Sequence, residues 1–405
     1  MNVRADRFAL MDSIRAIGAL AVLAAHAALL AGVYTSGSFL KPYVTQLDVA
    51  VTIFFMVSAF LLYRPFVKAR LAGKSRPDTR AYAWRRFLRI VPGYWVALTG
   101  VTIWLGLETV TSPAWHLPVY YGFGQIYTAE TDIGGLGQAW TLAVEASFYF
   151  FLPLWAIAVR KLSWRAELVA LAGVALFSIG WQVFALSHVN GNDFDVGGFT
   201  SGPWEHPLPN FLDQLALGMV LAVISVHGLP DRATRLFARA WPWWLLAAFL
   251  YWLLVQTVGA PTADVGTGTK IARHELHAVI AAAILVPAIF AWDRGGAIRR
   301  LLAWRPLLYV GLISYGIYLW NNAVLIKVST ATSDWMTDTL GLGTNGRFVL
   351  LFAGGLAGTV AIGTVSYYAF ERPMLSLKRL VQPRRGGEPA EAIAEPAPAT
   401  PVTAP

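Results

Sequence analysis

Long apolar segments recur along this 405-residue chain, and they restrict its fold more than any other feature. A membrane-spanning helix needs about 20 consecutive, mostly apolar residues. Because a backbone in lipid must satisfy its hydrogen bonds internally, we predict an all-α, polytopic membrane bundle of about ten transmembrane helices. The predicted spans are residues 9–32, 45–63, 90–107, 139–159, 166–186, 210–226, 240–258, 274–292, 307–327 and 348–369.

Composition agrees with a membrane protein and excludes several other classes. Only 14% of the residues are charged, against about 25% in a typical soluble protein. Cysteine is absent, which excludes disulfides, thiolate metal sites and a cysteine nucleophile. The net charge of +9 does not indicate nucleic-acid binding, because the basic residues lie in short loops between apolar segments. In such loops they set the orientation and contact anionic membrane lipid. Composition leaves the oligomeric state open.

The distribution of basic residues predicts the orientation in the membrane. With the N-terminus in the cytoplasm, 26 of the 32 Lys and Arg residues fall in inner segments and five in outer loops. Cytoplasmic loops carry such an excess, so both termini are predicted to be cytoplasmic. Residues 1–380 are predicted to form one bundle. Residues 381–405, rich in Pro, Ala and Glu, are predicted to be a disordered cytoplasmic tail.

The first apolar segment contains two ionisable residues, Arg15 and His26, with ten residues between them. Such a side chain at bilayer depth costs about 2.5–3.5 kcal/mol on insertion scales, which makes it a candidate for function. At a rise of 1.5 Å per residue, the two lie about 16 Å apart along a helix. We expect Arg15 toward the cytoplasm and His26 toward the outer face, too far apart to share an ion or a metal.

Two carboxylates, Asp48 and Glu145, are predicted at about the same depth as His26. Together the three could pair, and a carboxylate that fixes the tautomer of a histidine makes it a general base. Three other interpretations stay open on the sequence alone. The trio could be a structural hydrogen-bonded cluster, a proton relay in a secondary transporter, or part of a non-catalytic membrane scaffold.

A basic cluster lies at the predicted cytoplasmic start of the third span. In the string WRRFLRIVP, Arg86 and Arg89 are three residues apart and share a helical face, beside Arg85. Paired guanidinium groups at a helix end could hold phosphates bidentately. Juxtamembrane arginines also mark orientation and bind lipid headgroups, so the spacing leaves both roles open. Ser58 falls at about the depth of Arg15 in the second span.

No motif in the sequence predicts a metal site. The string His274-Glu275-Leu276-His277 lacks the i, i+4 histidine spacing of a helical zinc site, so we expect no metal. Two predicted outer loops, residues 108–138 and 187–209, contain no Lys or Arg and are rich in Gly, Pro and aromatic residues. Such loops are suited to cover an outward-facing cavity.

Six strings in order then make the chain recognisable over about residues 8–379: RAIGALAVLAAH, LDVAVTIFFMVSAFLL, RRFLRIVP, WTLAVEASFYFFLP, SYGIYLWN and FERP. The chain resembles the integral-membrane acyltransferase 3 family, which O-acetylates bacterial polysaccharides, peptidoglycan, antibiotics and glycolipids. The resemblance implies acyl transfer from a cytoplasmic acyl-CoA, expected to be acetyl-CoA, to a hydroxyl of a cell-envelope carbohydrate or glycolipid. It also implies a multi-pass protein of the bacterial cytoplasmic membrane.

The resemblance, together with the depths and clusters described above, gives the expected roles of individual residues. The expected catalytic residues are His26, Glu145, Asp48 and Arg15; those expected near the acyl-CoA are Arg86, Arg89, Arg85 and Ser58; those expected near the acceptor are Trp140, Asn321 and Tyr318. The chain departs from the family pattern at two positions. Asn321 stands where a histidine commonly follows tryptophan, and Ala146 stands where a second acid or polar residue commonly follows the glutamate.

Overall fold

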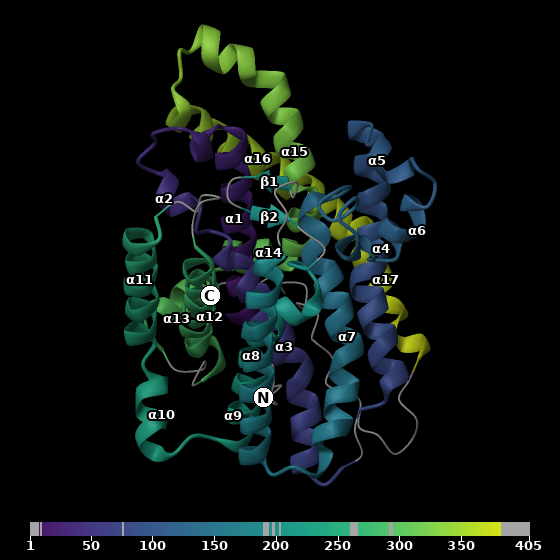
Figure 1. Cartoon of the computed structure of the whole chain (residues 1–405), viewed down its shortest axis with the longest axis vertical. Coiled ribbons are helices and arrows are strands. Elements are labelled where there is room, and N and C mark those ends of the chain that lie inside the picture. The colour runs from purple at the N-terminus through teal and green to yellow at the C-terminus, as the bar shows by residue number, and fades with distance from the viewer. Residues whose placement is uncertain are drawn as a thin grey trace, which may run out of the picture.

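The computed structural model describes residues 8, 10–74, 77–188, 194–196, 199–201, 204–259, 266–290 and 295–381. Its long helices run side by side along one axis of the molecule (Figure 1). Eight helical segments are long and apolar enough to cross a membrane, and two bent helix pairs raise the number to ten. The predicted bundle of about ten spans is therefore confirmed for the described residues.

The spanning segments contain the following helices: α1 (Leu10–Leu30), α3 (Val49–Leu71), α4 (Thr79–Leu105), α7 (Trp140–Ala158), α8 (Trp164–Ser187), α9 (Leu212–His227), α12 (Thr267–Ile289) and α16 (Thr344–Ser366). The first bent pair is α10 (Asp231–Ala238) with α11 (Ala240–Thr257), at 70°. The second is α14 (Arg305–Leu312) with α15 (Ser314–Asp334), at 73°.

Short elements connect or extend these helices. The helical ones are η1 (Val33–Thr35), α2 (Lys41–Val44), α5 (Glu108–Thr111), α6 (His116–Tyr121), η2 (Gln125–Tyr127), η3 (Gly137–Ala139), η4 (Val159–Lys161), η5 (Leu208–Phe211), α13 (Ala297–Leu302), η6 (Trp335–Thr339), η7 (Tyr367–Glu371), α17 (Arg372–Ser376) and η8 (Leu377–Leu380). One small antiparallel hairpin is an exception to the all-α prediction: β1 (Phe194–Val196) pairs with β2 (Phe199–Ser201), with Asp195 opposite Thr200.

Helix α4 begins eleven residues before its predicted start, and this moves the basic cluster. Asp78 caps the helix, because its carboxylate accepts a hydrogen bond of 2.8 Å from the backbone N–H of Arg80. Such a cap stabilises a helix start that hydropathy alone does not reveal. Arg85, Arg86 and Arg89 therefore lie in the second and third turns of α4, and the predicted helix-end placement is wrong.

The core is built around α1 and α3. Helix α1 contacts α3, α14, α15 and α16, while α3 packs closely against α9. The closeness of α3 and α9 depends on Gly218, where an added Cβ would lie 2.6 Å from the carbonyl oxygen of Met56. Large apolar side chains of α3 and α7 fill the space around this contact, among them Phe60, Tyr63 and Phe148, each less than 2% exposed. These packed helices hold the side chains of the site in place.

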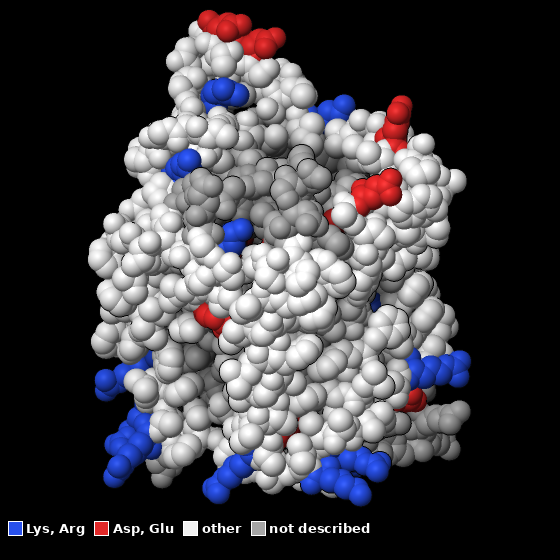
Figure 2. Space-filling view, in the orientation of Figure 1, with Lys and Arg blue, Asp and Glu red and all other residues white. Residues whose placement is uncertain are grey.

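Charge is distributed unevenly over the surface. In Figure 2, Lys and Arg side chains gather along the lower margin, beneath α3, α8 and α10 as oriented in Figure 1. This margin is the side that the positive-inside rule assigns to the cytoplasm. Residues 382–405, the greater part of the predicted tail, lie outside the described residues.

Candidate active site

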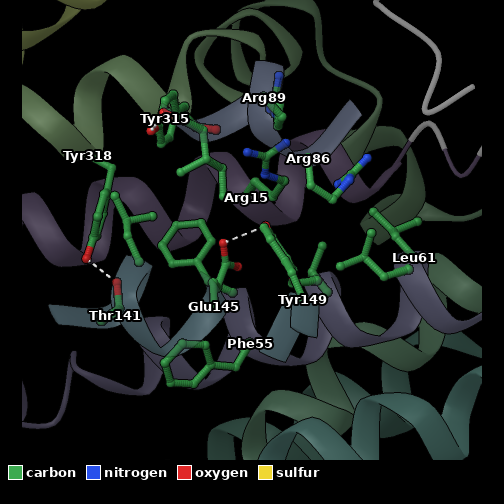
Figure 3. A pocket seen from close by; sticks show the side chains of 17 residues that line it. Arg15, Phe55, Leu61, Arg86, Arg89, Thr141, Glu145, Tyr149, Tyr315 and Tyr318 are labelled. Carbon is green, nitrogen blue, oxygen red and sulfur yellow. Dashed lines mark hydrogen bonds between the residues drawn. The ribbon is translucent and has the colours of Figure 1, made fainter. Parts of the chain in front are cut away.

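A cavity of about 110 Å³, partly open to solvent, lies among α1, α3, α4, α7 and α15. Figure 3 shows the side chains that line it. Among the described residues, the lining is Arg15, Phe54, Phe55, Val57, Ser58, Leu61, Leu62, Arg86, Arg89, Ile90, Thr141, Leu142, Glu145, Tyr149, Ser314, Tyr315 and Tyr318. Five helices distant in the sequence thus bring their polar side chains into one largely apolar chamber.

Three arginines give the cavity its charge. Arg15 comes from α1, and Arg86 and Arg89 come from one face of α4, so their guanidinium groups lie on one side of the chamber (Figure 3). The Nε atom of Arg86 is buried and has no hydrogen-bond partner among the described residues. Unpaired donors on clustered guanidinium groups are the arrangement that binds a phosphate or another anion.

Glu145 faces these arginines from α7. Its carboxylate accepts a hydrogen bond of 3.1 Å from the hydroxyl of Tyr149, one turn further along the same helix, and lies within reach of Ser58. The negative charge interacts with Arg15 and Arg86. Glu145 therefore offsets part of the positive charge that would otherwise be gathered in this apolar space.

The end of the cavity remote from Arg86 is closed by Tyr318 and Thr141. Their hydroxyl groups are 2.5 Å apart, and the Tyr318 hydroxyl also donates to the carbonyl of Gln138 (Figure 3). Phe54 packs edge-to-face against Tyr318, with ring centroids 5.9 Å apart. These contacts hold the Tyr318 ring across the chamber as a wall.

His26 lies just beyond this wall, and its partner is Asn321. The Nδ1 atom of His26 is hydrogen bonded to Asn321 Oδ1. Asn321 is three residues after Tyr318 on α15, which places it about 4.5 Å further along the helix on the same face. His26 therefore does not line the cavity, but it binds the residue that follows the cavity wall by about one helical turn.

The Asn321 amide determines which nitrogen of His26 carries the proton. Its Nδ2 group donates to the carbonyl groups of Ile317 (3.2 Å) and Tyr318 (2.6 Å), which directs Oδ1 at His26. A carbonyl oxygen only accepts hydrogen bonds, so Nδ1 of a neutral His26 must be the protonated nitrogen. The Nε2 lone pair is then left to accept a proton, which is the tautomer that a general base needs.

The three ionisable residues predicted at one depth have different partners. Asp48 precedes α3 and pairs with Arg273 of α12 at 2.5 Å, with His277 at 3.7 Å. Asp48 and Glu145 contribute no hydrogen bond or charge interaction to His26 in the described part of the chain. We expected a carboxylate to orient His26, but the group that does so is the neutral amide of Asn321. A residue's depth does not show in which direction its side chain leaves the helix.

Other predicted residues divide between the cavity and its surroundings. Ser58 and Tyr318 line the cavity, as do the arginines Arg15, Arg86 and Arg89 and the acid Glu145, whereas Arg85 does not. Trp140 does not line it either: its ring lies on that of His206, with centroids 4.5 Å apart. His206 in turn is 2.7 Å from Asp132. This hydrogen-bonded pair joins the two loops that contain no Lys or Arg.

One group outside the spans has a strongly perturbed acidity. Burial, with Asp132 and Glu130 nearby, raises the pKa of Tyr120 in α6 to about 12. Tyr120 lies within the 108–138 loop and is buried in one apolar cluster with Leu98 and Leu136.

Several residues of the site were not singled out from the sequence. Tyr149 and Thr141 flank Glu145 within its motif, so the i, i+4 spacing could have indicated them. Tyr315 donates from its hydroxyl to the carbonyl of Ile90 at 2.6 Å. Glu371, in the FERP string, is buried and interacts electrostatically with Arg15 and Arg89. No spacing rule would have joined this residue to helices more than 280 residues earlier.

The fold and this site define a multi-pass membrane protein with a cationic, largely apolar chamber among its helices. A family model described as "Acyltransferase domain", that of the acyltransferase 3 family, matches residues 8–364. The chain belongs to this family and is an acyltransferase. The predicted resemblance is confirmed, and membership favours an enzyme over a transporter or a scaffold.

Two relatives have informative names. The chain is 22% identical over 337 residues to "Putative peptidoglycan O-acetyltransferase YrhL" of Bacillus subtilis (strain 168), in a match that covers 78% of this chain and 48% of that protein. It is 25% identical over 361 residues to "Nodulation protein 10" of Rhizobium leguminosarum bv. viciae, covering 83% and 84% of the two chains. The chain thus spans about half the length of the first relative. No solved structure matches it.

Proposed function

We propose that the protein transfers an acyl group, acetyl in the first instance, from cytoplasmic acyl-CoA to a hydroxyl of a cell-envelope carbohydrate or glycolipid. The bacterial cytoplasmic membrane is the proposed location, with both termini inside. One observation carries the proposal: the residue one helical turn beyond the end of a cationic chamber, Asn321, holds His26 in the tautomer of a general base. The name of the Bacillus relative supports an acetyl group.

The chamber suits the anionic part of the donor. Coenzyme A carries several phosphate charges, and Arg86 and Arg89 present two guanidinium groups from one helical face, joined by Arg15 from α1. The remaining lining is mostly aliphatic and aromatic, which suits the neutral pantetheine arm. We propose that the phosphates bind at the arginines and that the thioester lies near Tyr318 and Thr141.

His26 then acts as the base of the transfer. Its Nε2 atom accepts the proton of the acceptor hydroxyl as the oxygen attacks the thioester carbonyl carbon. The carbon–oxygen bond forms and the carbon–sulfur bond breaks, and the departing thiolate receives the proton from the imidazolium. The alternative order, in which His26 first forms an acyl-histidine, uses the same groups and leaves the overall balance unchanged.

Radiolabelled donors test this function. Purified protein in lipid nanodiscs is incubated with labelled acetyl-CoA and a bacterial envelope extract, and the labelled product is identified. We expect a labelled carbohydrate or glycolipid with wild type and none with His26→Ala. Wild-type transfer by a folded His26→Ala variant would overturn the mechanism, and transfer from succinyl-CoA but not acetyl-CoA would overturn the donor assignment.

The donor site has a matched control on the same helix. Arg86→Ala and Arg89→Ala are each expected to raise the KM for acetyl-CoA about 10- to 100-fold, the range for losing one charged contact of about 1.5–3 kcal/mol. Arg80 lies in the first turn of α4 with an exposed side chain, and Arg80→Ala is expected to leave KM unchanged. Equal effects of all three substitutions would point to general surface charge rather than to the chamber.

A further inference from the structure

We propose that Asp213, His274 and Glu275 form a binding site for a divalent cation, with Zn²⁺ as the preferred ion. His274 and Glu275 belong to the string whose spacing argued against a zinc helix. The fold supplies the missing ligand from another helix, because Asp213 in the first turn of α9 lies against α12. The proposal replaces the expectation of no metal, and it is independent of the function proposed above.

The ligand atoms are close enough for one ion. One nitrogen or oxygen from each of the three residues lies within 4.8 Å of the other two, and His274 Nε2 is 2.9 Å from Asp213 Oδ2. Tetrahedral Zn²⁺ with bonds of about 2.0–2.1 Å places its ligands about 3.3 Å apart. The three side chains therefore need only small shifts to coordinate an ion.

His274 Nε2 faces a carboxylate and an amide donor group at the same time. This atom lies 2.9 Å from Asp213 Oδ2 and also 2.9 Å from the Nε2 donor group of Gln214. Protonated, this nitrogen faces a donor; unprotonated, it faces a carboxylate. The Oε1 atom of Gln214 is meanwhile buried with no hydrogen-bond partner among the described residues. Rotation of this amide would turn Oε1 toward the ring nitrogen and supply a fourth ligand.

The negative charges of the cluster also favour a bound cation. Asp213 and Glu275 bring two acidic groups together, and Asp213 is only 4% exposed. Buried like charges require a proton or a cation between them. Arg273, the neighbouring residue on α12, hydrogen bonds to Asp48 and Gln46 instead. A cation shared by Asp213 and Glu275 would compensate both charges at once.

The donor set favours a first-row transition metal. Imidazole suits Zn²⁺, Cu²⁺, Fe²⁺ and Ni²⁺, whereas Mg²⁺ and Ca²⁺ prefer oxygen ligands alone. One imidazole with two carboxylates and an amide oxygen is compatible with four-coordinate Zn²⁺. His274 and Glu275 are partly exposed, so the ion has a route into the site.

The site would fasten α9 to α12 beside the chamber. The His274 ring packs against Phe211, with centroids 5.8 Å apart, and Phe211 packs against Trp140 at 5.3 Å. Trp140 is the first residue of α7, the helix that carries Thr141 and Glu145 into the cavity. A bound ion would thus hold His274 and Phe211 in place against Trp140, at the start of the helix that lines the cavity.

Metal content tests the proposal without reference to activity. Protein purified through an affinity tag free of histidine is dialysed against Zn²⁺, then against metal-free buffer, and analysed by plasma mass spectrometry. We expect about one zinc per chain in wild type and less than a tenth of that in His274→Ala and Glu275→Gln. His227→Ala alters a histidine at the other end of α9 and is expected to retain the metal.

A thermal measurement guards against misfolding of the variants. EDTA is expected to lower the Tm of wild type and of His227→Ala by a few degrees, and to leave the Tm of Glu275→Gln unchanged. Wild type without zinc, or without a response of Tm to Zn²⁺ and EDTA, would overturn the proposal. Full zinc content in folded His274→Ala and Glu275→Gln would overturn this location.

Discussion

The pairing of His26 with Asn321 leads to a quantitative test by Asn321→Leu. Leucine has the branched shape of asparagine but is larger, and it lacks the Oδ1 atom that accepts from His26 Nδ1. The Ile317 and Tyr318 carbonyl groups lose only a side-chain donor. The substitution acts on the tautomer and orientation of His26. Because Asn321 is fully buried, the extra volume of leucine also strains the packing, and stability is therefore measured beside activity.

The magnitude follows from the role of each group. Loss of the base itself, in His26→Ala, removes general-base catalysis worth about 10²–10⁴-fold, or about 2.7–5.4 kcal/mol in the activation free energy. Loss of a residue that only orients a histidine costs about 10- to 100-fold, or about 1.4–2.7 kcal/mol. Asn321→Leu should thus reduce kcat more mildly than His26→Ala, with KM for acetyl-CoA unchanged.

The double variant distinguishes orientation from an independent role. Once His26 is absent, Asn321 has nothing to orient, so His26→Ala with Asn321→Leu should be no less active than His26→Ala alone. Transfer of labelled acetyl groups at saturating donor gives kcat for the four proteins. Asn321→Asp retains an acceptor and should restore activity to within tenfold of wild type.

Two results would refute this reasoning. Multiplicative losses in the double variant would mean that Asn321 acts on the reaction separately from His26. Wild-type activity of Asn321→Leu, beside an inactive His26→Ala, would mean that the tautomer does not depend on the amide. Size-exclusion profiles and Tm values of all variants establish that each comparison is between folded proteins.

Other predictions follow from the packing and the ion pairs. Asp48→Ala should lower the free energy of unfolding by about 1–3 kcal/mol, because Arg273 loses its carboxylate, while kcat per folded enzyme stays within tenfold, as measured by denaturation and transfer assays. A large loss of kcat in an Asp48→Ala variant of wild-type stability would mean that Asp48 takes part in catalysis. Gly218→Val should lower the Tm strongly by forcing α9 away from Met56, whereas Gly173→Val, on open α8 surface, should not.

Sequence reasoning was sufficient for the number of spans and named some residues of the chamber, but it did not name Thr141, Tyr149 or Tyr315 and did not predict the partners. Apolar length predicts a helix because lipid leaves the backbone no other solution. Depth then follows from residue count, and that estimate predicted His26, Asp48 and Glu145 at one level. Their partners depend on where each helix begins and how it is rotated. Asp48 precedes α3 and turns to α12, so equal depth did not bring it to His26.

The proposed metal cluster also depends on helix packing that the sequence does not reveal. A motif rule examines ligands within one helix, and on that test His274 and Glu275 fail. Asp213 lies about 60 residues earlier, and its position beside them depends on the contact between α9 and α12. Ligands from two helices leave no fixed spacing in the sequence, so only the packed structure could bring the set together.

The spacing of Arg15 and His26 determines not only their difference in depth but also which face of α1 each side chain leaves. Eleven residues at about 100° per residue correspond to three turns and about 20°, so both side chains leave nearly the same face of α1. Both then meet α15: Arg15 shares the chamber with Tyr318, and His26 binds Asn321 one turn beyond. A spacing of nine or thirteen residues would direct one of them to another face. The ten intervening residues therefore align the cationic chamber and the base along a single seam between α1 and α15.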